Sequence, residues 1–218
     1  MKKTSKALLL MLCAVLLVAA SVLGTMAYLT STDTVTNTFT VGNVKITLDE
    51  KDVDNDNNTS DNVTVNGVVR DKANSYKLLP GHTYTKDPTI HVDASSEDCY
   101  LFVKVENGIA DIEGTKTVAT QMAEKGWVAV SGTTGIYVYT TDRTNPAAVS
   151  ANTNIVVFEN FTVDGTKVVN VPEDETVPTG KLDIAEYDNN TITVTAYAVQ
   201  KDGFESKTAA EIWSTAGF

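Results

Sequence analysis

The chain has 218 residues, 42% of them hydrophobic, and a formal net charge of −11. This length is enough for one domain with a buried core, and the acidic balance disfavours binding to nucleic acid or to an anionic lipid surface. Without residues 1–27, Cys99 is the one cysteine left, which excludes an intrachain disulfide.

The first 27 residues have the three parts of a secretory signal peptide. Lysines at positions 2, 3 and 6 precede an apolar run from Ala7 to Leu23, and small side chains stand at Thr25 and Ala27. We expect signal cleavage between Ala27 and Tyr28, which leaves residues 28–218 as a single secreted domain without a stable membrane anchor. The alternative is an uncleaved anchor, because the apolar run reaches the lower end of the roughly 17–25 residues of a spanning helix.

The remaining sequence is typical of β-strands nearly throughout. Val35, Phe39 and Val41 alternate with threonines from Thr34 to Thr40, a period-2 pattern that predicts a strand. Asn66-Gly67 between two valine pairs predicts a hairpin, and Leu79-Pro80-Gly81 predicts a turn. Further strands are expected at residues 44–48, 89–92, 100–106, 127–130, 136–140, 154–161, 167–171 and 191–200.

Two short helices interrupt this pattern. Thr117–Lys125 has an apolar face and stops at Gly126, and Thr208 with Glu211 forms a capping box near the end of the chain. Many short strands with turns between them and few helices predict an all-β fold, an antiparallel β-sandwich or jelly roll.

The sequence contains no constellation typical of an enzyme, and we predict a protein without catalytic residues. Its two histidines, His82 and His91, lie on different predicted elements, and no metalloprotease motif surrounds them. Asp52, Asp54 and Asp56 match the opening of a calcium loop, but the glycine and the closing glutamate of that loop are missing. We expect a solvated acidic loop, with weak calcium binding as the alternative and no other cofactor.

Several phrases resemble a known family. Residues 24–31 and 37–48 resemble the signal and first strand of exported proteins processed by a SipW-type signal peptidase. This family includes the biofilm fibre protein TasA and camelysin. The phrases at residues 79–81, 86–89, 98–106 and 193–200 are also similar to it. The resemblance implies a jelly-roll protein of a Gram-positive bacterium, secreted to the extracellular matrix or cell surface, with a SipW-type peptidase as its processing partner.

The resemblance also implies self-association or association with related matrix subunits. In TasA-like fibres the N-terminal strand of one subunit completes a sheet of the next. The corresponding assembly strand here carries Val35, Phe39 and Val41, and pairing of residues 28–41 within their own domain is an equal alternative. Two different functions stay open beside this one: a camelysin-like surface metallopeptidase, and an adhesion module that binds calcium or carbohydrate.

Overall fold

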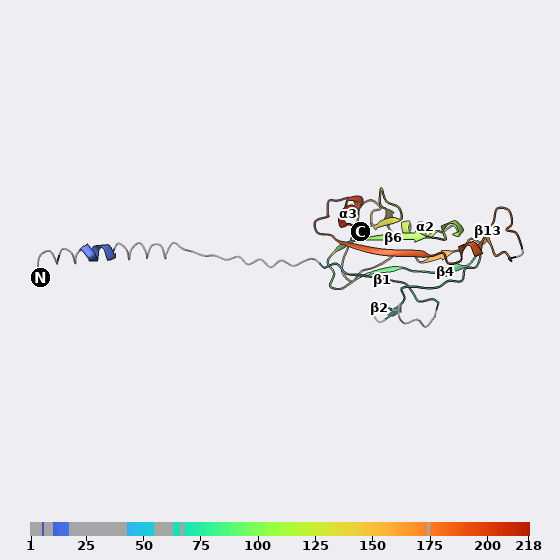
Figure 1. The fold of residues 1–218 in the computed structure, drawn as a ribbon, viewed down its shortest axis with the longest axis horizontal. Helices are drawn as coiled ribbons and strands as arrows, with labels where there is room; N and C mark the ends of the chain where they lie inside the picture. Colours follow the sequence, from blue (N-terminus) through green and yellow to red (C-terminus); the bar gives the residue numbers. More distant parts are fainter. Residues whose placement is uncertain (1–5, 7–10, 18–42, 55–62, 66–67, 174) are drawn as a thin grey trace. The chain divides into compact units, whose positions relative to one another are not determined.

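The computed structural model describes residue 6 and residues 11–17, 43–54, 63–65, 68–173 and 175–218. The chain divides into two units, residues 1–41 and residues 42–218. Residues 11–17 of the first unit are helical, and the second unit, called the body below, holds the other described elements (Figure 1). In the part of the chain that is described, no helix is both long and apolar enough to cross a membrane.

Two of the sequence predictions lie entirely on residues that the structure does not describe. These are the cleavage site between Ala27 and Tyr28 and the assembly strand with Val35, Phe39 and Val41. Both stay predictions.

The body confirms the prediction of an all-β fold, because it consists mostly of strands in antiparallel sheets. Its larger sheet has the strand order β14-β6-β8-β7, and β9 also pairs with β6. The long strand β14 pairs with β6 from Ile192 opposite Asn107 to Gln200 opposite Cys99. The strands of this sheet are β6 (Cys99–Asn107), β7 (Trp127–Ala129), β8 (Ile136–Tyr139), β9 (Ala148–Val149) and β14 (Ile192–Gln200).

A second layer of strands faces the larger sheet. It contains one sheet of order β1-β5-β10 and the pair β4–β11. Backbone hydrogen bonds from Lys86 to Glu159 and from Val157 to Pro88 connect the two pieces. The strands of this layer are β1 (Ile46–Asp49), β4 (Thr83–Thr85), β5 (Thr89–Val92), β10 (Asn154–Val156) and β11 (Asn160–Thr162).

The predicted strand over residues 154–161 is two strands in the structure. Val157 and Phe158 are consecutive, and both are 0% exposed. Because neighbouring residues of a regular strand point to opposite faces, burying both side chains in one core interrupts the strand. The short strands β4 and β9 were not expected from the sequence.

One hydrophobic core lies between the layers. Ile90 of β5 and Leu101 and Val103 of β6 belong to the same buried cluster as Val157 and Phe158. The opposite face of β6 is also covered, because Phe102 packs in a second cluster with Ile212 of α3 (Ala209–Ala216). Coverage on both faces explains why all residues from Cys99 to Val103 are buried.

Both predicted body helices form where their end signals place them. In α2 (Val118–Glu124) the side chain of Thr117 accepts a hydrogen bond from the backbone N–H of Thr120, and Gly126 follows with φ of 92°. In α3 both hydrogen bonds of the capping box between Thr208 and Glu211 are present.

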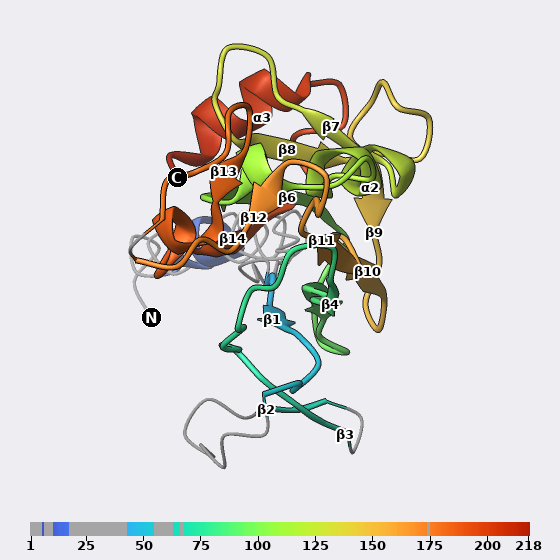
Figure 2. The same cartoon turned by 90° about the vertical axis from the view of Figure 1, so that its right-hand side faces the viewer.

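The predicted hairpin is also confirmed. Strands β2 (Val63–Val65) and β3 (Val68–Arg70) pair with each other and project from the body beyond β1 (Figure 2). Reciprocal backbone hydrogen bonds of 2.8 and 2.7 Å between Glu50 and Asp71 fasten the hairpin to the end of β1. The remaining elements are η1 (Ala110–Ile112), β12 (Val168–Val169), β13 (Leu182–Asp183) and η2 (Ile184–Tyr187).

Candidate functional site

The two layers meet along two edges, and one of these edges is closed. On that side the indole Nε1–H of Trp127 in β7 donates to the carbonyl oxygen of Val156 in β10, 3.2 Å away. Gln121 of α2 donates to the carbonyl of Asn160 at 2.8 Å, and its side-chain oxygen accepts from the backbone N–H of Glu159 at 3.2 Å. A side chain and a helix therefore join the layers along this edge.

The other edge lies between β1 and β14, and the described residues leave it open. A groove of about 1240 Å³ runs between these strands. Its apolar lining includes Ile46 and Leu48 of β1 and Ile192, Val194 and Ala196 of β14, all half-buried. In Figure 1 the long red-orange arrow of β14 lies between β6 and β1. The described residues thus leave the core incompletely covered on this side of the body.

Strand β14 forms a long edge without the usual protection. It has nine residues and ends its sheet, since among the described strands only β6 pairs with it. Its sequence Ile-Thr-Val-Thr-Ala-Tyr-Ala-Val-Gln contains no charged residue, proline or glycine. Exposed edge strands usually carry such residues or are very short, because unpaired backbone N–H and C=O groups recruit other strands. The chemistry of this edge favours strand addition.

One end of the groove is built by the irregular segment 72–79. The Tyr76 hydroxyl donates to the carbonyl of Thr85 at 3.0 Å, and the Tyr84 hydroxyl donates to the carbonyl of Lys77 at 2.6 Å. The Tyr84 ring stacks on Phe161 with ring centroids 4.9 Å apart. Burial, with the negative charge of Glu50 nearby, raises the pKa of Tyr76, so this phenol remains a neutral hydrogen-bond donor. The segment is therefore held firmly against β4.

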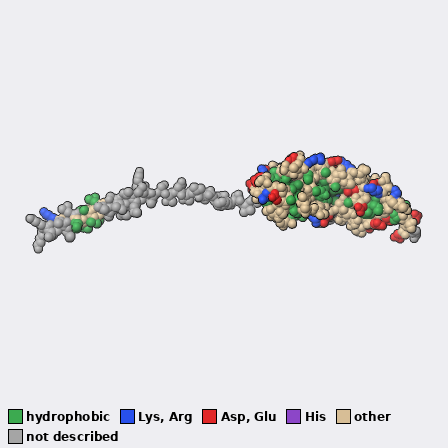
Figure 3. Space-filling model, turned by 90° about the horizontal axis from the view of Figure 1, so that it is seen from above, with side chains coloured by type: hydrophobic (Ala, Val, Ile, Leu, Met, Phe, Trp, Pro, Cys, Tyr) green, Lys and Arg blue, Asp and Glu red, His purple; other side chains and the backbone are tan. Residues whose placement is uncertain are grey.

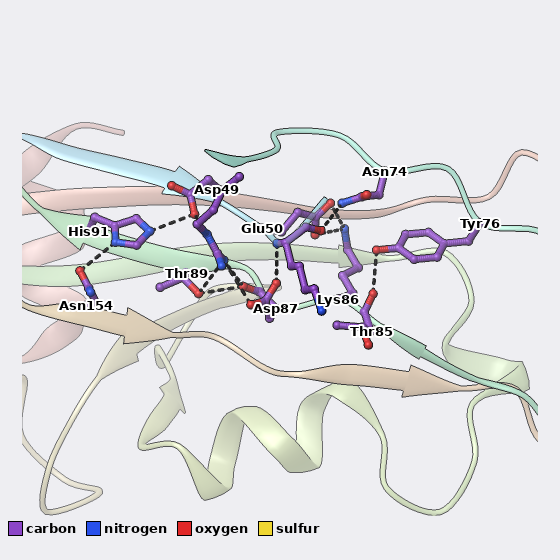
Figure 4. A network of polar contacts seen from close by, with 12 residues as sticks. Asp49, Glu50, Asn74, Tyr76, Thr85, Lys86, Asp87, Thr89, His91 and Asn154 are labelled. Atoms are coloured by element: carbon purple, nitrogen blue, oxygen red, sulfur yellow. Dashed lines mark hydrogen bonds and ion pairs between the residues drawn. The ribbon is translucent and has the colours of Figure 1, made fainter. Parts of the chain in front are cut away.

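A polar network fixes the end of β1 (Figure 4). The Asp49 side chain is fully buried, and its Oδ1 accepts hydrogen bonds from Arg70 Nε and from His91 Nε2, the latter at 2.9 Å. The other ring nitrogen of His91 lies 2.8 Å from Asn154 Oδ1. Because these residues come from β1, β3, β5 and β10, the network ties the projecting hairpin to the smaller sheet.

Two acidic side chains beside Asp49 complete this network. Arg70 also forms an ion pair with Asp87 at 3.2 Å, and Lys86 pairs with Glu50 at 2.7 Å. Burial alone would lower the pKa of Arg70, but the hydrogen bond to Asp49 and the charges of Asp87 and Asp49 raise it overall. The guanidinium is therefore firmly charged, as a buried carboxylate partner requires.

The predicted calcium residues are brought together only in part. Oxygens of Asp52 and Asp54 lie within 4.8 Å of each other and of an oxygen of Asp71, a residue that the sequence did not single out. Asp56 lies outside the described residues. Asp71 Oδ1 already accepts from the backbone N–H groups of Lys72 and Ala73. Calcium binding stays a prediction.

The structure places His82 beside an exposed turn and His91 on β5, with 13% of the His91 side chain exposed. Within the described residues, the acidic group of Asp52, Asp54 and Asp71 contains no histidine. The metallopeptidase hypothesis stays a prediction as well.

No protein-family model, curated protein or solved structure matches this chain. The resemblance to SipW-dependent exported proteins is therefore supported by the sequence phrases alone.

Sequence reasoning missed the groove and the Asp49–Arg70 pair. A signal for the pair exists, since Arg70 is one of two arginines in the chain and follows the valines of a predicted strand. A signal for the open edge also exists in the uncharged alternating run from Thr191 to Gln200. Neither signal identifies the partner, because the contacts join residues far apart in sequence.

Proposed function

We propose that the protein is a secreted structural subunit of extracellular matrix or cell-surface fibres. In this proposal, residues 28–41 of one mature copy enter the groove between β1 and β14 of the next copy. The observation that carries the proposal is the uncharged nine-residue edge of β14 beside a groove with Ile46, Leu48, Ile192 and Val194 in its lining. An added strand would satisfy the free backbone groups and cover the half-buried side chains at the same time.

The expected donor segment has the pattern that such a groove requires. Val35, Phe39 and Val41 share one side of an extended chain with Asp33 and Asn37, and threonines occupy the other side. Apolar side chains at alternate positions would fill the groove between Ile46 and Val194, while main-chain hydrogen bonds supply affinity. The family resemblance of residues 24–48 supports the same role.

This contact is head-to-tail, because a terminal segment meets a groove elsewhere on the next copy. Heterologous contacts that do not close produce open filaments.

The proposal includes the finer fold and processing expectations: a jelly-roll sandwich, removal of residues 1–27 and a function outside the cell. The face that carries α3 mixes acidic and basic side chains with hydrophobic patches between them (Figure 3). The net charge of −11 favours solubility before assembly.

A truncation tests the proposal. The mature chain from Tyr28 is compared with a chain that lacks residues 28–40, by negative-stain microscopy and light scattering. We expect fibres from the first and a folded, non-polymerising monomer from the second, since the body has its own core. Fibres of equal number and length from the truncated chain would contradict the proposal.

A groove variant gives an independent test. Val194→Arg places a charge on the apolar wall of the groove, and Ser131→Arg adds the same charge to an exposed loop between β7 and β8. We expect Val194→Arg to abolish fibres and Ser131→Arg to retain them, with circular dichroism melting used to verify that both are folded. Normal fibres from a folded Val194→Arg variant would exclude the groove as the assembly site.

A further inference from the structure

The groove extends beyond the first residue of β14, Ile192, into a part with more polar side chains. Its lining there includes Tyr187 of η2 and the residues that follow it up to Asn190, together with residues 74–78 of the irregular segment. In Figure 1, β13, which directly precedes η2, and β4, which holds the irregular segment, lie toward the same end of the body. This part of the groove, lined by residues 74–78 and 187–190, is called the polar end below.

The charges in the groove lining are balanced, although the whole chain has a net charge of −11. Among the described residues, the charged side chains of the lining are the acidic Asp49, Glu50 and Asp188 and the basic Lys72, Lys77 and Lys86. A lining with equal numbers of both signs attracts neither anions nor cations strongly. The composition of the groove therefore favours an uncharged ligand.

Two side chains at the polar end are available to such a ligand. Tyr187 is half-buried and Asn189 is exposed, and neither side chain forms a hydrogen bond with another described residue. Their neighbours are already engaged, since the Asn190 amide donates to the carbonyl of Gly108 at 2.9 Å and the Tyr76 hydroxyl donates to Thr85. An aromatic ring and an unused amide thus line the same end of the groove.

The polar end has no strand edge among the described residues. Helix η2 ends at Tyr187, β14 begins at Ile192, and segment 72–79 is irregular. An extended peptide gains affinity by pairing its main chain with a strand edge, which this end of the groove does not offer. The recognition chemistry here consists of side chains.

We propose that the polar end binds a neutral oligosaccharide, with the Tyr187 ring against one face of a sugar unit and the Asn189 amide at its hydroxyl groups. A sugar ring carries C–H groups on its faces and hydroxyls around its rim, so an aromatic side chain beside an unused amide matches it. The groove of about 1240 Å³ has room for several sugar units. Sugar binding here does not depend on fibre formation, because the added strand is assigned to the stretch between Ile46 and Val194.

Isothermal titration calorimetry on the mature chain, residues 28–218, tests the site. The neutral probes are cellohexaose, mannohexaose and chitohexaose. The comparison probes are hexagalacturonic acid, which is anionic, and an uncharged hexapeptide of alternating threonine and valine. Tyr187→Leu removes the ring and keeps an apolar side chain, and Asn189→Gly removes the amide at a residue with φ of 64°, which glycine adopts without strain. The matched control is Asn152→Gly, because Asn152 is also exposed, has φ of 59° and lies outside the groove lining.

We expect at least one neutral hexasaccharide to bind with a Kd below about 1 mM. Tyr187→Leu and Asn189→Gly should each weaken that binding at least about tenfold, and Asn152→Gly should leave it unchanged, with circular dichroism melting used to verify that all three are folded. Binding of the anionic sugar or the hexapeptide without binding of any neutral sugar would overturn the proposal. Absence of binding by all probes, or equal affinities in the folded Asn189→Gly and Asn152→Gly variants, would also overturn it.

Discussion

Arg70 of the projecting hairpin reaches Asp49 at the end of β1 and donates its Nε–H to a carboxylate oxygen that no solvent contacts. Only 17% of the Arg70 side chain is exposed, and the Asp49 side chain is fully buried. The second Asp49 oxygen has no hydrogen-bond partner among the described residues. The buried carboxylate is therefore balanced by Arg70 and His91.

Arg70→Met should strongly destabilise the body, because it leaves the Asp49 charge buried without its cation. Loss of one partner of a buried ion pair costs about 3–5 kcal/mol. Urea unfolding followed by circular dichroism measures the change in the free energy of unfolding. The matched control is Lys45→Met, which removes an exposed ion pair with Asp93 at 3.2 Å and should cost at most about 1 kcal/mol. Equal losses in both variants would show that Asp49 is not isolated from water.

Gly126→Ala should also destabilise the body, for two separable reasons. Gly126 has φ of 92°, and an added Cβ would lie 2.3 Å from the carbonyl oxygen of Thr140. Gly132→Ala is the matched control, since Gly132 has φ of 78° and no atom within 4 Å of such a Cβ. The control measures left-handed backbone strain, about 1–2 kcal/mol, and the excess loss at Gly126 measures the clash. Similar melting temperatures for the two variants would contradict the close contact with Thr140.

Local features of the fold were predictable because neighbouring residues determine them. The strand Thr89–Val92 and the capping box of Thr208 and Glu211 occur where the sequence predicts them, since alternation and capping act within a few residues. The break at Val157 and Phe158 was not predictable, because it depends on a core to which both layers contribute.

The candidate site illustrates the same limit. Arg70 and Asp49 are separated by 21 positions in sequence, and β1 and β14 by far more. Strand order decides which edges stay free, and a single sequence contains no direct record of strand order. The alternation of threonines at residues 191–195 was visible, but its position at the end of a sheet was not.

The buried carboxyl group of Glu113 should make the free energy of unfolding depend on pH. It is 4% exposed, accepts a hydrogen bond from the backbone N–H of Val118 at 2.9 Å, and burial raises its pKa in the folded protein. A raised carboxyl pKa means that the folded state binds the proton more tightly than the unfolded state. This contribution to stability therefore falls as pH rises from the ordinary glutamate value of about 4.3 through the raised value.

Glu113→Gln isolates this effect, because the amide oxygen still accepts from Val118 without carrying a charge. Relative to the native protein, the variant should gain stability at neutral pH, and the gain should shrink as pH falls through the raised pKa. Urea unfolding at several pH values from about 4 to about 7.5 measures the difference in free energy of unfolding between the two proteins. The other carboxyl groups are the same in both proteins, so their contributions cancel in this difference. If the difference in free energy of unfolding between variant and native protein does not change with pH, the Glu113 carboxyl has the same pKa in the folded and unfolded states, which would contradict the prediction.

The burial of Cys99 predicts that the proposed assembly does not depend on disulfides. The thiol is fully buried in the core, and burial, with the charge of Asp98 nearby, raises its pKa to about 11. Because the thiolate is the reactive form, iodoacetamide at about pH 8 should label the native mature chain very slowly and the urea-unfolded chain rapidly, as mass spectrometry can follow. Fibres should also persist in excess reducing agent, since the contact proposed above consists of main-chain hydrogen bonds and side-chain packing. Rapid labelling of the folded chain would show that the thiol is accessible, and fibres that dissolve on reduction would point to a covalent link through Cys99 in place of strand addition.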